Sequence, residues 1–301
     1  MTTHLKILSE GSYAGNPRNE DRLGYVGDAA WLMDGATGLG PSKFSDKTDA
    51  EWLVGAMSGF LTETFTNDPE VDTLDALSHA IEAVGEGYRR ATHNADLEAF
   101  ARPSAGLSLV RVNGEDVELS HLADVKAYVF DKVGGYKVYG GGPLEALDNS
   151  ALEALRKVQA QQAEPDLKAA REEINPVLRQ NRAMMNTPDG YWVLTLDPVC
   201  LEGLKTEYLK AADISYILLA TDGFYDLWEN YVIGGLHDIK RRLIAGEDDS
   251  IIAELRRIET DDPHGIKHTR FKLHDDASWL LLAIEGFGEK ARSRTGPERR
   301  E

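Results

Sequence analysis

The dipeptide Asn113-Gly114 lies between two apolar runs, Leu107 to Val112 and Val117 to Leu122, and it constrains the fold more than any other feature of the chain. Asn-Gly readily supplies the positive φ angles that both central residues of a type I′ turn require, so the two runs are expected to pair as a β-hairpin. A second hairpin is expected around Gly134-Gly135. Two successive hairpins predict antiparallel sheet in the middle of the chain.

Two amphipathic helices are predicted before this region. Thr48-x-x-Glu51 forms a capping box, and apolar residues follow it at helical spacing as far as Phe65. A second apolar stripe of the same period runs from Leu74 to Tyr88. Each stripe is expected to pack against a sheet.

Further helices are predicted after the hairpins. Residues 150–185 are expected to be helical, with a break at Pro165 and a kink at Pro176, and residues 230–259 are expected to be helical as well. The remaining expected strands are Leu23 to Gly27, Ala30 to Met33, Tyr191 to Leu196, Tyr216 to Ala220 and Ser278 to Ile284. Strands along the whole length, with helix pairs between them, predict a layered α+β fold.

The domain organisation is expected to be simple. No internal repeat or low-complexity linker divides the sequence, so residues 1–286 are expected to form one domain. The polar end of the chain, residues 287–301, is expected to be a mobile tail.

The chain is strongly acidic, with 33 Lys and Arg against 51 Asp and Glu among 301 residues and a formal net charge of −18. Such a surface repels phosphate backbones and anionic lipids, so neither nucleic acid nor a membrane is expected as a partner. The sequence has 1 cysteine, Cys200, which excludes an intrachain disulfide and a cysteine metal cluster. Because no apolar segment has the length of a signal peptide or a membrane span, a cytoplasmic location is expected.

Four acidic clusters lie where strands are expected to end. They are Asn19-Glu20-Asp21, Met33-Asp34-Gly35, Thr221-Asp222-Gly223 and His274-Asp275-Asp276. A carboxylate at the end of a buried strand has to be paired, hydrogen-bonded or bound to a metal, and no Lys or Arg lies within these strands. Several carboxylates without local bases are typical of a site for hard divalent cations. A single Asp-Gly more often only turns the chain, but four clusters together favour the metal site.

The same clusters resemble a known family. The segments Asn19-Glu20-Asp21-Arg22, Asp34-Gly35-Ala36-Thr37-Gly38, Ala220-Thr221-Asp222-Gly223-Phe224-Tyr225-Asp226 and Asp275-Asp276-Ala277-Ser278 are similar, in this order, to the metal-site motifs of PPM (type 2C) protein serine/threonine phosphatases. The segment from Asp222 to Asp226 is the most specific of them. The resemblance implies a four-layer α-β-β-α sandwich, in which helix pairs flank two antiparallel sheets.

The resemblance also implies a set of site residues. Asp34 would bridge two Mn²⁺ or Mg²⁺ ions, and Asp222 and Asp275 would complete one of them. The other ion would be bound by the backbone carbonyl of Gly35 together with Glu20 and Asp21, directly or through water. The three aspartates Asp34, Asp222 and Asp275 would thus act in catalysis through a metal-activated water that attacks phosphorus. The implied substrate is a protein phosphorylated on serine or threonine.

Three positions leave alternatives open. Asp124 resembles an aspartate that helps to bind a third ion in some members, but it could equally cap a hairpin turn. Many eukaryotic members have a proposed acid, a histidine, at the position of Ala36, and members usually have a phosphate-binding arginine at the position of Asn16. Arg18 is the nearest replacement, because in an extended strand it would point to the same side as Glu20, although it could also be a surface residue.

Two other functions have some support in the sequence. The segment from Gly35 to Lys43 follows a strand, but Pro41 and Ser42 separate Gly40 from Lys43, so it does not match a P-loop. The stronger alternative is a phosphatase-like binding or sensor module without catalysis. Because all four principal acidic positions are present, the enzyme is favoured.

Overall fold

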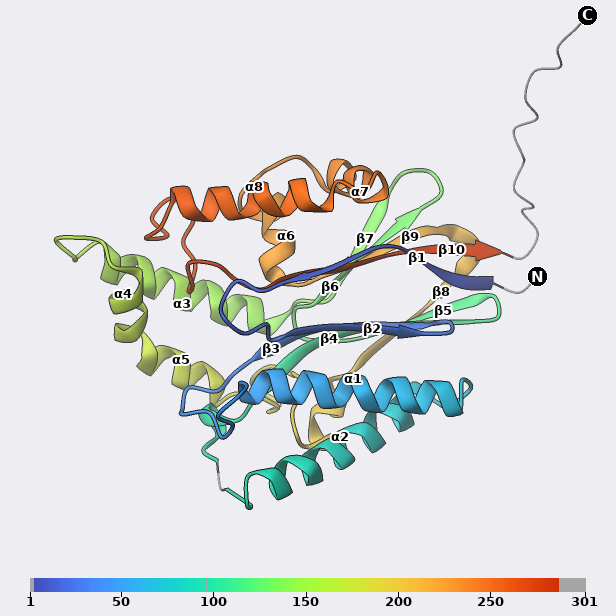
Figure 1. Ribbon diagram of the computed structural model, residues 1–301, viewed down its shortest axis with the longest axis horizontal. Helices are drawn as coiled ribbons and strands as arrows, with labels where there is room; N and C mark the ends of the chain where they lie inside the picture. The colour runs from blue at the N-terminus through green and yellow to red at the C-terminus, as the bar shows by residue number, and fades with distance from the viewer. Residues whose placement is uncertain (1–2, 96, 287–301) are drawn as a thin grey trace, which may run out of the picture.

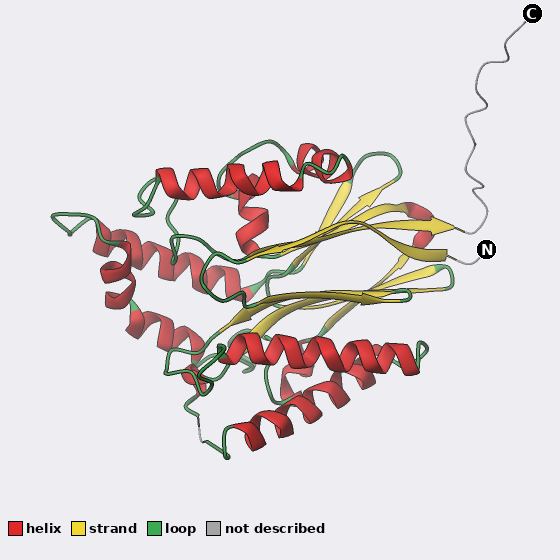
Figure 2. Ribbon diagram, in the orientation of Figure 1, coloured by secondary structure: helices red, strands yellow, loops and turns green. Residues whose placement is uncertain are grey.

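The computed structural model describes residues 3–95 and 97–286, and these residues form two antiparallel sheets packed face to face with helices outside them (Figures 1 and 2). One five-stranded sheet has the order β1-β10-β9-β6-β7, and the other has the order β2-β3-β4-β5-β8. The strands of the first sheet are β1 (Thr3–Tyr13), β10 (Ala277–Gly286), β9 (Ile214–Ala220), β6 (Lys126–Asp131) and β7 (Tyr136–Tyr139). The strands of the second are β2 (Asp21–Val26), β3 (Ala29–Ala36), β4 (Ser104–Asn113), β5 (Asp116–Leu122) and β8 (Lys205–Lys210).

The central hairpin forms as predicted, but its turn differs. Asn113 pairs with Asp116, so the two-residue loop is Gly114-Glu115 rather than Asn113-Gly114. Of these residues only Gly114 has a positive φ, of 63°. A two-residue loop whose first residue is a glycine with positive φ suits a type II′ turn, so the prediction of a type I′ turn was wrong. The second hairpin, of β6 and β7, is confirmed.

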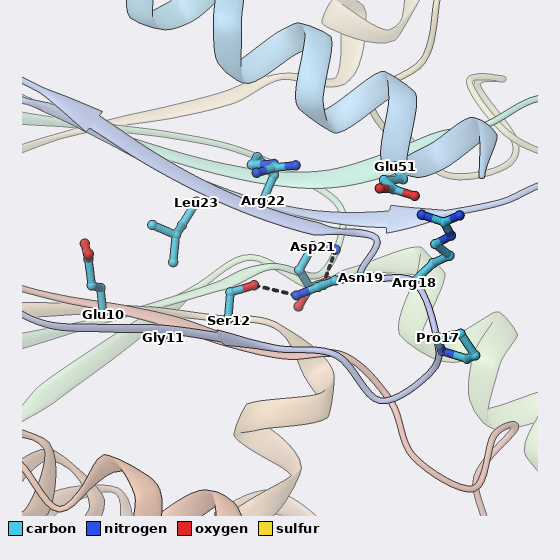
Figure 3. Close-up of a pocket in the computed structure, with 10 residues that line it drawn as sticks. All are labelled: Glu10, Gly11, Ser12, Pro17, Arg18, Asn19, Asp21, Arg22, Leu23 and Glu51. Carbon is cyan, nitrogen blue, oxygen red and sulfur yellow. Dashed lines mark hydrogen bonds between the residues drawn. The ribbon is translucent and has the colours of Figure 1, made fainter. Parts of the chain in front are cut away.

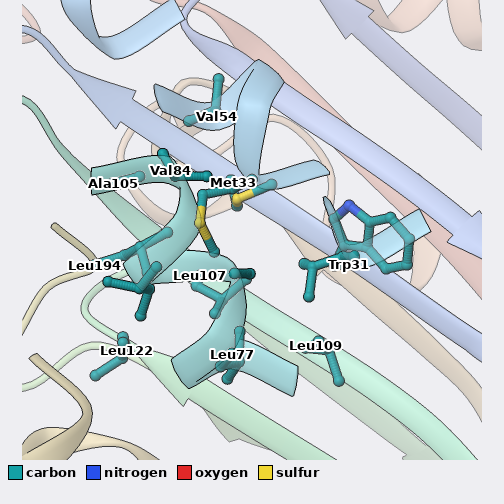
Figure 4. Close-up of a cluster of buried hydrophobic side chains, with 14 of the residues drawn as sticks. Trp31, Met33, Val54, Leu77, Val84, Ala105, Leu107, Leu109, Leu122 and Leu194 are labelled. Carbon is teal, nitrogen blue, oxygen red and sulfur yellow. The ribbon is translucent and has the colours of Figure 1, made fainter. Parts of the chain in front are cut away.

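The helices α1 (Asp49–Asn67) and α2 (Thr73–Ala91) cover the outer face of the second sheet. The capping box at Thr48 is confirmed, with Glu51 N donating to Thr48 Oγ1 at 3.0 Å. Their buried side chains pack against Trp31 and Met33 of β3 (Figure 4). Leu74, predicted as part of the apolar stripe, is 49% exposed because it lies in the first turn of α2.

The outer face of the first sheet is covered by α6 (Asp222–Glu229), α7 (Leu236–Ile244) and α8 (Asp248–Asp261). Phe224 of α6 stacks on Trp279 of β10 with ring centroids 4.5 Å apart. Between the two sheets lies a third apolar layer that includes Leu32, Leu219 and Leu280. The predicted four-layer α-β-β-α sandwich is therefore confirmed.

A group of three helices, α3 (Pro143–Gln159), α4 (Leu167–Glu173) and α5 (Asn175–Arg182), lies beside the ends of the sheets and is called the flap below (Figure 1). The predicted break and kink are confirmed, because Pro165 lies between α3 and α4, and α5 begins beside Pro176. Short 3₁₀ segments are η1 (Ala99–Ala101), η2 (Pro198–Gly203) and η3 (Ala211–Asp213).

Some predicted features differ from the structure. The segment from Tyr191 to Leu196 is not a strand, because β5 pairs with β4 from Leu107 onwards and leaves room for a single bridge between Ala105 and Leu194. The strands β1 and β8 were not predicted. The expected tail, residues 287–301, lies outside the described residues. None of the helices in the described ranges is long and apolar enough to cross a membrane.

Candidate metal centre

The four acidic clusters meet at one end of the gap between the sheets. Asp21 begins β2 and is the register partner of Asp34 on β3, so both belong to the second sheet. Asp222 follows β9 after Thr221, and Asp275 precedes β10; these two strands are neighbours in the first sheet. The Thr221 hydroxyl donates to Asp21 Oδ2 at 3.0 Å and joins the two sheets at this point. The structure thus brings together side chains that lie far apart in the sequence.

Asp124 also reaches this centre, from the connection between β5 and β6. A Cβ atom on Gly106 would lie 2.8 Å from Asp124 Oδ1, and Gly106 is the register partner of Asp34. The carboxylate of Asp124 therefore lies beside the strand that carries Asp34. The preceding residue, Ala123, has a positive φ of 59°, a backbone conformation that non-glycine residues rarely adopt.

The glycines of the two Asp-Gly pairs permit a close approach of chains. A Cβ on Gly35 would lie 2.4 Å from the carbonyl oxygen of Glu20, and a Cβ on Gly223 would lie 2.1 Å from that of Asp276. Neither glycine has a positive φ. The view that Asp-Gly only turns the chain is thus wrong for both pairs, because each glycine makes room for another acidic segment.

Asp276 holds the N-terminal loop in place, a role that the sequence did not reveal. Its Oδ1 accepts from Gly15 N at 2.8 Å, and its Oδ2 accepts from Glu20 N at 2.7 Å. The side chain of Glu20 in turn accepts a hydrogen bond from the Thr37 hydroxyl. These bonds fix Glu20 next to the strand ends that carry Asp21 and Asp34.

The carboxylates of the centre repel one another. Burial, and then the charges of neighbouring aspartates, raise the pKa of Asp34 and of Asp222 well above their usual range. Burial, together with Asp276 and Asp275, raises the pKa of Asp21 to about 7 against hydrogen bonds from Ser278 and Thr221. Such groups need compensating positive charge to remain ionised at neutral pH.

The donor set fits hard divalent cations. All its side-chain donors are carboxylate oxygens, which Mg²⁺ and Mn²⁺ prefer over nitrogen or sulfur. Within the part of the chain that the structure describes, no three acidic, histidine or cysteine side chains are arranged closely enough to coordinate one ion. The carboxylates of the centre thus have the chemical type and the charge that such ions require. The ions would have to draw them closer together on binding.

Arg18 does not lie as the sequence suggested. It is in a bend, and β2 begins only at Asp21, so the assumed extended strand is absent. Its exposed side chain borders a cavity of about 520 Å³ that Asp21 and Arg22 also line, and it extends toward Glu51 on α1 (Figure 3). Among the described residues it has no hydrogen-bond or ion-pair partner.

A different cation lies at the centre. Lys272 Nζ is 2.7 Å from Asp275 Oδ1. Burial lowers the pKa of Lys272, but the charges of Asp275, Asp222 and Asp34 outweigh it and raise that pKa above its usual value. Sequence reasoning missed this residue, and the one available signal was its position three residues before Asp275.

The flap is fastened to the same region. The guanidinium of Arg182, at the end of α5, donates to the carbonyl oxygens of Arg102 at 2.7 Å and of Ala36 at 3.4 Å. Lys126 Nζ lies 3.0 Å from Glu145 of α3 and 2.7 Å from Glu229 of α6. Residues from the flap and from the sandwich thus border the centre together.

Comparison with known proteins agrees with this architecture. The family model described as protein phosphatase 2C matches residues 11–238. No curated protein matches the chain. Among solved structures, the catalytic domain of the serine threonine protein phosphatase PstP in complex with 2 manganese ions is 15% identical, with a TM-score of 0.57 over 95% of this chain and 100% of that one. The serine/threonine phosphatase PstP/Ppp of Mycobacterium tuberculosis is 16% identical, with a TM-score of 0.56 over 94% and 100%. Stp1 of Staphylococcus aureus is 15% identical, with a TM-score of 0.52 over 95% and 96%.

A two-sheet sandwich with a group of carboxylates at one end is the architecture that the sequence resemblance implied for a metal-dependent phosphoester hydrolase. Because the family model matches more than half of the sequence, this chain belongs to the protein phosphatase 2C family. It is a metal-dependent protein serine/threonine phosphatase.

Proposed function

We propose that this chain hydrolyses phosphoserine and phosphothreonine in a protein substrate and that two divalent ions, Mn²⁺ or Mg²⁺, are bound at the carboxylate centre. The observation that supports the proposal is the convergence of the carboxylates of Asp21, Asp34 and Asp222, whose pKa values are raised by burial and then by the charges of neighbouring aspartates. The manganese ions of the PstP structure support the same view.

Each residue has an assigned role in this proposal. Asp34 is assigned as the bridging ligand. After burial, the charges of both Asp21, on the second sheet, and Asp222, beside the first sheet, raise its pKa. Asp222 and Asp275 bind the ion on the side of the first sheet. The ligands assigned to the other ion are the side chains of Glu20 and Asp21 and the carbonyl of Gly35. Asp124 is assigned to a possible third ion.

When bound, the ions would supply an acidic water as nucleophile and would offset the charge of the phosphate. The residues of the chain position these ions and the substrate, and no side chain has to form a phosphoenzyme. Cys200 is not a nucleophile, because it is buried in the apolar core and burial raises the pKa of its thiol to about 11. Ala36 stands at the position of the histidine that many eukaryotic members have, so the proton for the leaving group would come from water or from another side chain.

The phosphoprotein substrate is proposed to enter beside the flap. Arg18 is assigned as a cation at the edge of the centre, next to the cavity that Asp21 lines. From there it would contact the substrate rather than the ions.

The test is hydrolysis of p-nitrophenyl phosphate and of phosphoserine and phosphothreonine peptides with Mn²⁺, with Mg²⁺ and with EDTA. Turnover is expected with either ion and is expected to stop in EDTA. Full activity of the metal-stripped chain in chelator would refute the two-ion mechanism. Binding of phosphopeptides in Mn²⁺ without any turnover would instead support a sensor module.

A further inference from the structure

Lys272 lies on a well-anchored segment, the connection between α8 and β10, at residues 262–276. The carboxylate of Asp262 accepts hydrogen bonds from three successive backbone amides that begin at Ile266, and it pairs with Arg270 at 3.0 Å. Phe271, the residue before Lys272, packs against the apolar cluster of the flap. The backbone that leads to Lys272 is thus held in place by these contacts.

The contact between Lys272 and Asp275 uses one oxygen of the carboxylate. Asp275 Oδ1 accepts from Lys272 Nζ at 2.7 Å and from Asp276 N at 2.9 Å. Within the described ranges no residue bonds to Oδ2 of Asp275. An ion can therefore bind through Oδ2 while Lys272 keeps its place, so metal binding does not require the ammonium to leave.

The ammonium group also has donors that no contact uses in the described part of the chain. It carries three N–H groups, and the only hydrogen-bond acceptor for it in the described part of the chain is Asp275. The Lys272 side chain is 42% exposed, so a ligand can reach it. The 2.7 Å contact with Asp275, a carboxylate proposed to bind one of the ions, places the ammonium beside the centre.

The centre needs such a cation. A phosphate monoester dianion that approaches this group of carboxylates is repelled unless ions and at least one basic side chain reverse the local field. Asn16 is exposed and hydrogen-bonded to the carbonyl of His274, and it carries no charge. Arg18 extends away toward Glu51.

We propose that Lys272 binds the phosphoryl group of the substrate through its ammonium, beside the ion that Asp275 and Asp222 hold. The inference rests on the proposed function. The ligand class is a phosphate monoester dianion, and the product, inorganic phosphate, makes the same contact.

The experiment measures binding of inorganic phosphate to the Mn²⁺-loaded chain by isothermal titration calorimetry. The variants are Lys272→Met and Lys272→Arg, and the control is Lys267→Met, which removes the same charge from an exposed position in the same segment. Mn²⁺ affinity is titrated separately by electron paramagnetic resonance, and thermal melting confirms that each variant is folded.

Lys272→Met is expected to weaken phosphate binding by about tenfold or more, the scale of one lost charge-assisted hydrogen bond. Lys272→Arg recovers part of that loss, and Lys267→Met binds as the wild type does. Mn²⁺ affinity stays within about threefold, and KM for a phosphopeptide rises in parallel with the phosphate Kd.

Three results would overturn the inference: phosphate affinity unchanged in Mn²⁺-loaded Lys272→Met, no phosphate binding to the Mn²⁺-loaded wild type, or a loss fully explained by weaker Mn²⁺ binding. The last result would make Lys272 a counter-ion of Asp275 alone. Failure of the proposed function is seen separately, as a wild-type chain that binds Mn²⁺ and phosphate but hydrolyses no phosphoester.

Discussion

Asp222→Asn tests whether the carboxylate centre is built for cations, because it is expected to stabilise the metal-free chain. Burial and the neighbouring charges of Asp275 and Asp124 raise the pKa of Asp222 well above its usual value. A carboxyl group with a raised pKa in the folded state costs stability as pH rises from its unfolded pKa through its folded pKa. Asparagine keeps the shape of the side chain and removes its charge. The gain in the free energy of unfolding should therefore be full near pH 8 and vanish near pH 4.

The magnitude can be scaled from Asp21, whose pKa rises from 3.8 to about 7. Each pKa unit corresponds to about 1.4 kcal/mol, so a shift of this size amounts to roughly 4 kcal/mol for an independent group. Because the carboxylates of the centre titrate together, removing the charge of Asp222 is expected to stabilise the folded chain by less than this, about 1 to 3 kcal/mol. At roughly 2 °C for each kcal/mol in a large domain, the melting temperature in EDTA at pH 8 should rise by about 2 to 6 °C.

The assay is thermal melting of wild type and variant in EDTA and in excess Mn²⁺, from pH 5 to pH 8. In Mn²⁺ the order should reverse, because a ligand at about 100 times its Kd stabilises the wild type by about 2.7 kcal/mol and the variant has lost a charged donor. The control is Asp213→Asn, at an exposed aspartate of η3. It should leave the melting temperature unchanged both in EDTA and in Mn²⁺. If Asp222→Asn melts at or below the wild type in EDTA at pH 8, the carboxylates do not repel one another as inferred.

A second assay of Asp222→Asn and three further variants test individual contacts. Asp222→Asn should lower kcat in Mn²⁺ by about 100-fold or more, measured with p-nitrophenyl phosphate, and unchanged turnover would remove Asp222 from the ligand set. Asp276→Asn leaves one of two backbone amides without its acceptor, so denaturant titration should show a loss of about 1 to 3 kcal/mol, together with weaker Mn²⁺ binding. Ala123→Gly relieves a positive φ and should raise the free energy of unfolding by about 0.5 to 1 kcal/mol; a loss would mean that the alanine side chain matters more than the backbone conformation. Arg18→Ala should raise KM for a phosphopeptide by about tenfold, and an equal KM would assign Arg18 to the surface.

Local signals predicted the elements that depend on neighbouring residues. The capping box at Thr48 and the apolar stripe after it specify α1 without reference to the rest of the chain. The central hairpin is equally local, yet its turn moved by one residue, because the pairing of Asn113 with Asp116 sets the loop. Asn113 therefore ends a strand, whereas the Asn-Gly rule places it within the turn.

The parts that could not be predicted depend on distant partners. The segment around Leu194 has the apolar pattern of a strand, but β5 occupies most of the edge of β4 that it would need. The acidic clusters predicted a centre, whereas the clamp of Asp276 on Glu20 joins residues 256 positions apart. Lys272 carried no signal of its own, because a lysine near an aspartate is common on protein surfaces and only the fold brings it to the centre.

The pairing of the first strand with the last has a consequence for synthesis of the chain. β1 pairs with β10 from Thr3, opposite Gly286, to Tyr13, opposite Ala277. In the centre, Asp21 follows β1 in the sequence and Asp275 precedes β10. A chain emerging from the ribosome therefore cannot assemble the proposed ion site until Asp275 and β10 have been made. A nascent or truncated chain without β10 lacks both Asp275, just before this strand, and the partner of β1. Phosphatase activity would thus begin only with the completed domain, and tight Mn²⁺ uptake would report that completion directly.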